Sequence, residues 1–186
     1  MRIIAGKKKG IKIFSPLGTI TRPSSNRIRE TIMGVLEGGR YGDPLNSKLI
    51  LDLFSGTGSL GLEASSRGSA EKVIFVESNI SATKVLKKNI NNLGIDKQSI
   101  IINTDATKIS KWSLKPIGLI FSDPPYFSKL SNIVLNLLSQ LKVFKKDAIA
   151  VLETSHKESN PNVKDFEVCE TRKVGKTHLH FLKYNY

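Results

Sequence analysis

The chain has 186 residues, of which 39% are hydrophobic and 24% charged, and its Lys and Arg outnumber its Asp and Glu by 29 to 16. This length suits one domain with at most a small appendage, and a core of that size needs no disulfide or metal to fold. The formal net charge of +13 favours a polyanionic partner, nucleic acid before a membrane surface, although a lysine-rich solubility shell is the plainer interpretation. A single cysteine, Cys169, fits a reducing cytoplasm, and we expect neither a membrane span nor a signal peptide because no long apolar segment is present.

The first 46 residues predict a basic extension made of a β-hairpin and a helix. We expect two short strands, RIIA and IKIF, around the tip GKKKG, followed by a loop. A helix is predicted in NRIRETIMGVLEG, capped by Ser24 or Ser25, because Ile28, Ile32 and Leu36 recur on one helical face.

From residue 47 onwards, strand patterns alternate with helical patterns. Apolar runs typical of buried strands occupy residues 49–54, 72–77, 99–106, 116–123 and 148–155. Helical patterns occupy residues 59–68, 78–94 and 129–144, and two closing strands are expected at 166–174 and 177–184. The alternation predicts an α/β fold with a Rossmann-like, mostly parallel sheet and an antiparallel strand near the C-terminus. We divide the chain into a 1–46 extension and a 47–186 domain, together one compact unit.

A glycine-rich loop, FSGTG at residues 54–58, follows the first strand of this domain. Ligands of open α/β sheets bind beyond the carboxyl ends of the strands, and glycines permit a tight turn and close approach. The spacing of Gly56, Gly58 and Gly61 also matches the dinucleotide fingerprint, so NAD is an alternative cofactor. Asp52, inside the preceding strand, favours S-adenosylmethionine, whose amino group it would hold through the loop backbone or water. The plainer interpretation of Asp52 is an acid that satisfies loop N–H groups.

Two more acids end the next two strands. Glu77 ends the second strand, where it would accept hydrogen bonds from both ribose hydroxyls, a role that NAD enzymes share. Asp105 ends the third strand, where it suits the adenine amino group, although Asp is also a common helix cap.

The fourth strand runs into Ser122, Asp123, Pro124, Pro125 and Tyr126. The two prolines fix φ and remove two N–H donors, which leaves a rigid surface of carbonyl acceptors beside a carboxylate. The Asp123 side chain and the Pro124 carbonyl would accept both hydrogens of an exocyclic base amine and localise its lone pair for attack on a sulfonium methyl. Tyr126 would stack on a base splayed out of its helix. The plainer interpretation is a proline-rich loop with a buried aromatic residue.

Four segments of the sequence together resemble one known family. They are MRIIAGKKKGIKI, TRPSSNRIRETIMGVL, LDLFSGTGSLGLEASSRG and SDPPY. Nearly the whole chain is similar to the RsmD family of bacterial 16S ribosomal RNA guanine-N2 methyltransferases. The resemblance implies a Rossmann-like S-adenosylmethionine-dependent methyltransferase fold in which residues 123–126 hold the target guanine amine. The cofactor-binding residues that it implies are Asp52, Phe54, Ser55, Gly56, Thr57, Gly58, Glu77, Ser78, Asp105 and Ala106, with Arg22, Pro23 and Ser24 near the methionine end.

The chain departs from the family pattern in two places. The family more often has R-P-T-x-D-R-V-R-E, whereas Ser24 here replaces Thr and Asn26 replaces Asp. Ser24 keeps the hydroxyl, but Asn26 loses a charge. Residues 174–177 replace a Y-G-D-T-like turn before the last strand, which leaves open any role of that Tyr or Asp.

Basic residues on the N-terminal hairpin are candidate phosphate contacts, with a solvated hairpin tip as the alternative. The candidate RNA-binding residues are Arg2, Lys7, Lys8, Lys9, Lys12 and Phe127, the last extending the surface of Tyr126. His156, His178 and His180 are too scattered in the sequence to predict a metal site. The expected partner is ribosomal RNA or the small ribosomal subunit, and we expect a cytoplasmic monomer that does not engage a membrane.

Two other functions share most of these features. An adenine-N6 or other amino-methyltransferase on DNA or RNA would have the same loop and the same Asp-Pro-Pro-Tyr segment. A non-catalytic RNA-binding factor of ribosome assembly would share the fold, but it would not need the acid before the two prolines. An NAD oxidoreductase is more distant because no hydride-transfer base is evident.

Overall fold

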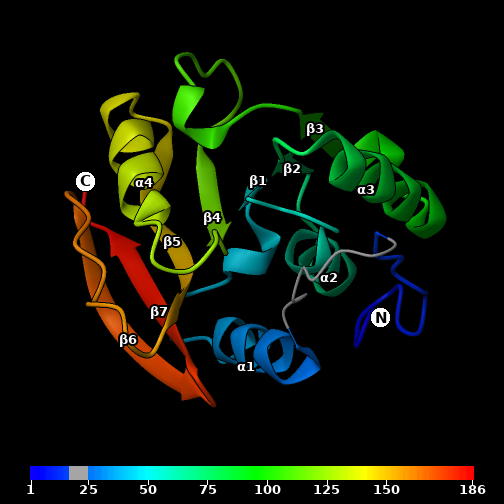
Figure 1. The fold of residues 1–186 in the computed structure, drawn as a ribbon, viewed down its shortest axis with the longest axis horizontal. Helices are drawn as coiled ribbons and strands as arrows, with labels where there is room; N and C mark the ends of the chain where they lie inside the picture. Colours follow the sequence, from blue (N-terminus) through cyan, green and yellow to red (C-terminus); the bar gives the residue numbers. More distant parts are fainter. Residues whose placement is uncertain (17–24) are drawn as a thin grey trace.

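The computed structural model describes residues 1–16 and 25–186, which form a seven-stranded sheet with helices on both faces (Figure 1). The strands are β1 (Leu49–Leu53), β2 (Lys72–Val76), β3 (Ser99–Ile102), β4 (Ile117–Ser122), β5 (Phe144–Ser155), β6 (Phe166–Val174) and β7 (Thr177–Tyr184). The α-helices are α1 (Asn26–Glu37), α2 (Ser59–Arg67), α3 (Ile80–Leu93) and α4 (Leu130–Gln140), and the short 3-10 helices are η1 (Pro44–Asn46), η2 (Asp96–Gln98) and η3 (Ala106–Lys108).

The strand order of the sheet is β3-β2-β1-β4-β5-β7-β6. Neighbours from β3 to β5 are parallel, and β7 lies antiparallel between β5 and β6, which confirms the predicted mixed sheet. The chain runs outward from β1 to β3 and returns beside β1 at β4. The loops after β1 and β4 therefore meet at the topological switch point, where open α/β sheets bind ligands.

Alternate side chains of the parallel strands divide the core into two layers. Ile50, Phe75 and Phe121 pack with apolar side chains of α1, α2 and α3 on one face of the sheet. Leu51 and Ile74 pack with α4 on the opposite face. Because both faces are covered, the strands have the continuous apolar composition that identified them in the sequence.

The N-terminal segment is a turn closed by an isolated β-bridge between Arg2 and Lys12, so the two predicted strands are wrong. Its two arms are antiparallel, with Ile3 N donating to Ile11 O at 3.0 Å and Ile13 N to Met1 O at 2.9 Å, but two other backbone donors go to α2. Ile4 N and Ala5 N donate to the Glu63 carboxylate on α2 at 2.9 and 3.0 Å. The antiparallel pairing is therefore limited to the one bridge, and beyond it the Glu63 side chain satisfies two backbone donors of the segment.

The same turn docks closely onto α2. Lys7 N donates to Ser66 O at 2.8 Å. Gly6 makes this approach possible: its φ is +81°, and a Cβ there would lie 2.0 Å from Ser66 O. Ile3 and Ile13 are buried in the same core layer as α1 and α2. The basic segment is thus packed onto the sheet and its helices.

The expected helix after the loop is α1, and Ser25 caps it by accepting from Ile28 N at 3.2 Å. Its predicted apolar face is buried. Element ends differ more: the third strand stops at Ile102, and the helix expected to reach residue 144 ends at Gln140 because Phe144 already pairs with Ile117 in the sheet. Among residues 1–16 and 25–186, no helix is long and apolar enough to cross a bilayer.

Candidate active site

A cavity of about 800 Å³ opens beyond the carboxyl ends of β1, β2 and β4. The predicted cofactor residues that line it are Phe54, Ser55, Gly56, Thr57, Glu77, Ser78, Asp105 and Ala106. The predicted amine-binding segment, residues 123–126, lines it as well, so the structure brings both predicted sites into one cavity. Asp52 and Gly58 are not on its wall, and Arg22, Pro23 and Ser24 lie outside the described residues.

The loop after β1 is folded tightly by residues in the left-handed region. Phe54 has φ 55°, Gly56 φ 52° and Gly58 φ 80°. A Cβ at Gly58 would lie 2.4 Å from Leu86 on α3, whereas beside Gly56 there is open space. Gly58 therefore serves packing, and Gly56 leaves the loop backbone accessible to a ligand in the cavity.

Asp52 acts inside the protein. Its side chain is 2% exposed, and Oδ2 accepts from Gly61 N on α2 at 2.9 Å. Burial raises the pKa of Asp52 well above its usual range, the Gly61 hydrogen bond opposes this, and the nearby Asp123 and Glu77 add to it. The geometry favours the plainer interpretation of Asp52, an acid that fixes the start of α2 behind the loop.

Glu77 and Asp105 line the cavity and also hold backbone groups. Glu77 Oε2 accepts from Gly56 N at 2.8 Å, and Oε1 accepts from Asn79 N at 2.7 Å. Asp105 Oδ1 accepts from both the N–H and the hydroxyl of Thr107, which makes it the cap of η3 and lowers the pKa of Asp105. A carboxylate oxygen has two lone pairs, so these bonds leave acceptor capacity for a ligand.

Tyr126 is anchored from two other elements. Its hydroxyl donates to Glu153 Oε1 on β5 at 3.0 Å and lies 2.9 Å from Thr177 Oγ1 at the start of β7. Burial raises the pKa of Tyr126 to about 12, with the neighbouring Glu153 adding to the rise and Thr177 opposing it. The ring is therefore held at both ends, by the chain at Pro125 and by the hydroxyl.

The charge of the cavity distinguishes between cofactors. Its wall includes the carboxylates of Glu77, Asp105, Asp123 and Glu153, and among the described residues that line it none is Lys or Arg. This contrasts with the net charge of +13 for the chain. An acidic wall suits a sulfonium and an ammonium group, and it disfavours a pyrophosphate. The residues present therefore fit S-adenosylmethionine better than NAD.

Comparisons with known proteins identify relatives along nearly the whole chain. The family model described as "Conserved hypothetical protein 95" matches residues 1–183. Ribosomal RNA small subunit methyltransferase D of Buchnera aphidicola is 37% identical over 158 residues, covering 84% of this chain and 79% of that protein. The protein of that name in Escherichia coli is 29% identical, covering 88% and 79%.

The chain belongs to the RsmD family of ribosomal RNA methyltransferases. A solved structure of the Escherichia coli protein yhhF, described as a methyltransferase, superposes with a TM-score of 0.84 at 26% identity and covers 100% of this chain and 98% of that one. An RNA methyltransferase of Salinibacter ruber in complex with S-adenosyl-L-homocysteine has a TM-score of 0.63, covering 88% and 94%, and at 11% identity it shows a shared fold.

At two of the departures from the RsmD pattern, Asn26 and residues 174–177, the structure shows what the residues present do, while Ser24 lies outside the described residues. Asn26 keeps an acceptor in place of the missing charge, because Oδ1 accepts from Arg29 Nη2 at 2.7 Å. Residues 174–177 still form the turn between β6 and β7, and the Thr177 hydroxyl forms a hydrogen bond with the Tyr126 hydroxyl. Sequence reasoning missed Thr177 and Glu153 as site residues. Glu153 had a signal, an acid in an otherwise apolar strand, whereas nothing in the sequence pairs Thr177 with a tyrosine 51 residues away.

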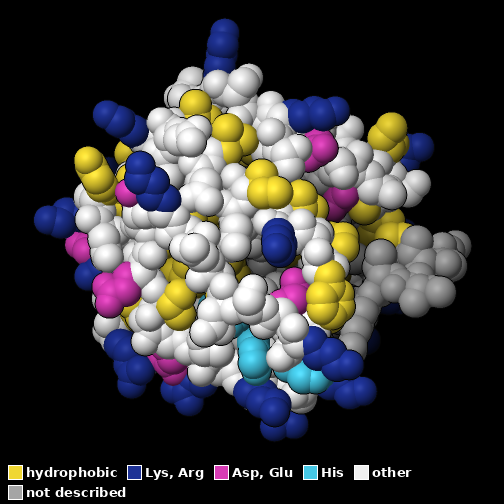
Figure 2. Space-filling view, turned by 60° about the vertical axis from the view of Figure 1, so that its left-hand side comes forward, with side chains coloured by type: hydrophobic (Ala, Val, Ile, Leu, Met, Phe, Trp, Pro, Cys, Tyr) yellow, Lys and Arg dark blue, Asp and Glu magenta, His cyan; other side chains and the backbone are white. Residues whose placement is uncertain are grey.

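The predicted RNA-binding cations Arg2, Lys7, Lys8, Lys9 and Lys12 all lie on the N-terminal turn that the Arg2–Lys12 bridge closes. Arg2 Nη1 donates to Gly10 O at 2.8 Å and so helps to close its own turn. Lys12 Nζ lies 5.2 Å from the centre of the Phe14 ring. Lys and Arg side chains are distributed around the face shown in Figure 2 and do not gather in a single patch there. Within the described residues, no group of three His, Cys, Asp or Glu side chains is placed to hold a metal ion.

Proposed function

We propose that this chain transfers a methyl group from S-adenosylmethionine to the exocyclic N2 amine of a guanine in 16S ribosomal RNA. One observation supports the chemistry: the glycine loop and the segment Asp123, Pro124, Pro125 and Tyr126 line the same acidic cavity. Membership of the RsmD family supports the choice of substrate. The proposal places the enzyme in the cytoplasm as a monomer that acts on ribosomal RNA or the small subunit.

The residues would divide the work as follows. When bound, S-adenosylmethionine supplies an electrophilic methyl group on its sulfonium. Glu77 would accept from the ribose hydroxyls and Asp105 from the adenine amine, and the backbone around Gly56 would contact the methionine moiety. Asp52 would act on the cofactor indirectly, by fixing the loop through Gly61.

The target amine is a poor nucleophile because its lone pair is delocalised into the base. The Asp123 carboxylate and the Pro124 carbonyl would accept its two hydrogens, which localises the lone pair on N2, and Asp123 would take the proton released after transfer. Tyr126, with its hydroxyl anchored to Glu153 and Thr177, would hold the splayed base by stacking. In this arrangement the rate enhancement would come from positioning the base and from fixed hydrogen-bond acceptors for its amine.

To test this, the protein is incubated with labelled S-adenosylmethionine and with unmethylated small subunits, naked 16S RNA or DNA. The labelled nucleoside is identified after digestion. We expect N2-methylguanosine from an RNA substrate. Label on adenine would overturn the choice of guanine, and absence of transfer to all three would favour the RNA-binding factor. Methylation of subunits but not naked RNA, or the reverse, would identify the physiological substrate.

A variant pair tests the role of Asp123. Asp123→Ala should lower the rate of transfer by at least about a hundredfold, because it removes a fixed acceptor from the reacting amine, while cofactor binding persists. Asp147→Ala is the matched control, since Asp147 is paired with Lys183 on the surface. Loss of cofactor binding in Asp123→Ala would show that we had assigned the wrong role.

A further inference from the structure

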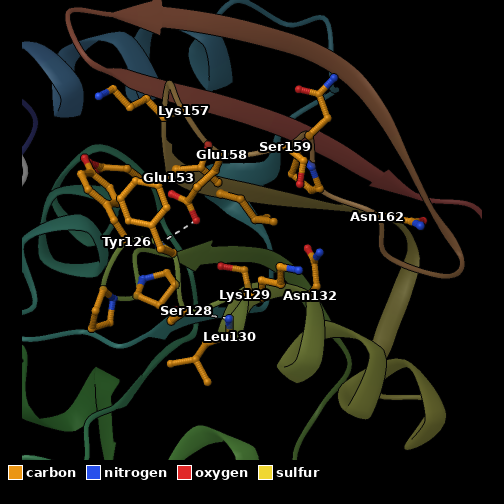
Figure 3. Close-up of a pocket in the computed structure, with 18 residues that line it drawn as sticks. Tyr126, Ser128, Lys129, Leu130, Asn132, Glu153, Lys157, Glu158, Ser159 and Asn162 are labelled. Atoms are coloured by element: carbon orange, nitrogen blue, oxygen red, sulfur yellow. Dashed lines mark hydrogen bonds between the residues drawn. The ribbon is translucent and has the colours of Figure 1, made fainter.

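Figure 3 shows a second cavity, of about 420 Å³, which shares part of its lining with the cofactor cavity. It opens between residues 128–132, at the start of α4, and residues 157–162, which follow β5. The residues common to both walls are Pro124, Pro125, Tyr126, Leu130 and Glu153. A group held in the second cavity would therefore lie beside the place where the proposed function puts the target amine. Its volume is within the range of ligand-binding pockets, roughly 300–1,000 Å³.

Phe127 lines this cavity in an unusual backbone conformation. Its φ is 63°, a left-handed value that bulky residues rarely adopt, and its side chain is 64% exposed. Glu158 holds it there: Phe127 N donates to Oε1 at 2.9 Å, and Ser155 N donates to Oε2 at 2.6 Å. Strained backbone that persists because its surroundings fix it tends to mark functional sites. Here the Glu158 clamp keeps a large aromatic ring at the surface beside a cavity, where burial would otherwise be favoured.

The rest of the wall has a different chemistry from the acidic cofactor cavity. It is made largely of neutral amides and hydroxyls with two exposed lysines, among them Ser128, Lys129, Asn132, Lys157, Ser159 and Asn162. Among the described residues that line this cavity, the acid other than the shared Glu153 is Glu158, and both of its oxygens already accept from backbone N–H groups. Amides and hydroxyls pair with base edges and ribose hydroxyls, lysines with phosphates, and an exposed aromatic ring with a base face.

We propose that the second cavity is a subsite for the RNA nucleotide covalently next to the target guanine. Its base would stack on Phe127, and its phosphate would lie near Lys129 and Lys157. Glu158 is the positioning residue that presents Phe127. The subsite rests on the proposed function, because a guanine bound at the shared wall carries its neighbour to this cavity. Such a subsite would let the enzyme recognise the nucleotide beside its target guanine as well as the guanine itself.

The first test measures steady-state kinetics on unmethylated small subunits together with the affinity for S-adenosylhomocysteine. Phe127→Ala should raise KM for the subunit about tenfold, the scale expected for loss of one base–aromatic stack, and leave kcat and cofactor affinity nearly unchanged. Phe127→Trp should restore KM, and Glu158→Ala should raise it by releasing the backbone of Phe127. Ile133→Ala is the control, because Ile133 is 52% exposed on α4 but does not line the cavity.

The second test locates the contact. A photoreactive phenylalanine analogue at position 127 should crosslink to the nucleotide adjoining the methylated guanine, and the same analogue at position 133 should not. The subsite is overturned if Phe127→Ala behaves like Ile133→Ala, if it acts through cofactor affinity, or if the crosslink maps away from the target. Wild-type protein that methylates RNA in those cases preserves the proposed function, whereas wild-type protein without transfer to any RNA removes both.

Discussion

Replacing Glu63 by Gln tests how the basic N-terminal segment is held to the rest of the protein. The Glu63 carboxylate is fully buried on α2 and accepts from four donors. Ile4 N and Ala5 N donate at 2.9 and 3.0 Å, Arg29 Nη1 at 3.2 Å and Arg67 Nε at 2.9 Å. One side chain thus connects the N-terminal turn, α1 and α2 without contact with solvent.

The structure sets the size of the effect. Breaking a buried ion pair by removing one charge costs about 3–5 kcal/mol, because the partner is left buried and uncompensated. Arg29 is that partner: its side chain is fully buried, and burial lowers the pKa of its guanidinium while Glu63 opposes the shift. Glu63→Gln also turns an amide N–H₂ towards donors. Since the whole protein is expected to be stable by roughly 5–15 kcal/mol, the loss should be a large share of it.

Urea unfolding followed by circular dichroism measures this directly. With a slope of about 2–3 kcal/mol per molar urea, the midpoint should fall by about 1–2.5 M. Glu37→Gln is the control, because Glu37 also pairs with Arg67 but its side chain is 45% exposed, and such pairs contribute about 0–1 kcal/mol. Equal losses in the two variants would refute the reasoning. Two separate transitions in Glu63→Gln would show instead that residues 1–46 unfold apart from the domain.

Three further substitutions have definite expected outcomes. Tyr126→Phe removes the hydrogen bonds to Glu153 and Thr177 but keeps the ring, so single-turnover methylation should slow about tenfold with cofactor affinity unchanged; an unchanged rate would contradict the anchoring role. Asn89→Ala removes bonds to Phe14 N, Phe14 O and Thr57 O, and calorimetry should show S-adenosylhomocysteine binding weakened several-fold along with a loss of about 2–3 kcal/mol of stability. His180 is buried between Thr154 and Thr171, and burial, aided by His178, lowers the pKa of His180 to about 4. The unfolded chain then binds the proton more readily than the folded protein, so the free energy of unfolding should be highest above pH 6.5 and fall by up to about 3 kcal/mol as the pH falls to 4. His180→Asn should remove this dependence of the free energy of unfolding on pH. An identical dependence in the variant would show that another group titrates.

The sheet and the wall of the cavity could be predicted from the sequence for a physical reason. Strands buried on both faces must be apolar throughout, and parallel strands place their carboxyl ends at one edge. Residues that end β1, β2 and β4, such as Gly56, Glu77 and Asp123, therefore had to converge whatever the details of packing. The pattern of apolar strands therefore predicts which residues line the cavity, even though it predicts no individual contact.

The parts that could not be predicted depend on contacts between distant side chains and backbone groups. The N-terminal segment pairs at one antiparallel bridge, but two of its backbone donors, Ile4 N and Ala5 N, go to Glu63, about 60 residues away in the sequence. The anchoring of Tyr126 by Glu153 and Thr177 is of the same kind. Asp52 shows a third case: its place before the glycine loop was informative, but burial directs its carboxylate into the protein.

Three acids, two that line the cofactor cavity and one buried behind it, bind the protein's own backbone. Asp52 fixes Gly61, Glu77 holds Gly56 and Asn79, and Asp105 caps η3. Each of these bonds shapes a segment that the cofactor would touch, so the site is formed before a ligand arrives. Preorganisation of this kind lowers the ordering cost of binding. The carboxylates on the wall give an otherwise strongly basic protein an acidic cavity. They would select a cationic cofactor there, while the basic surface of the protein would attract RNA phosphates.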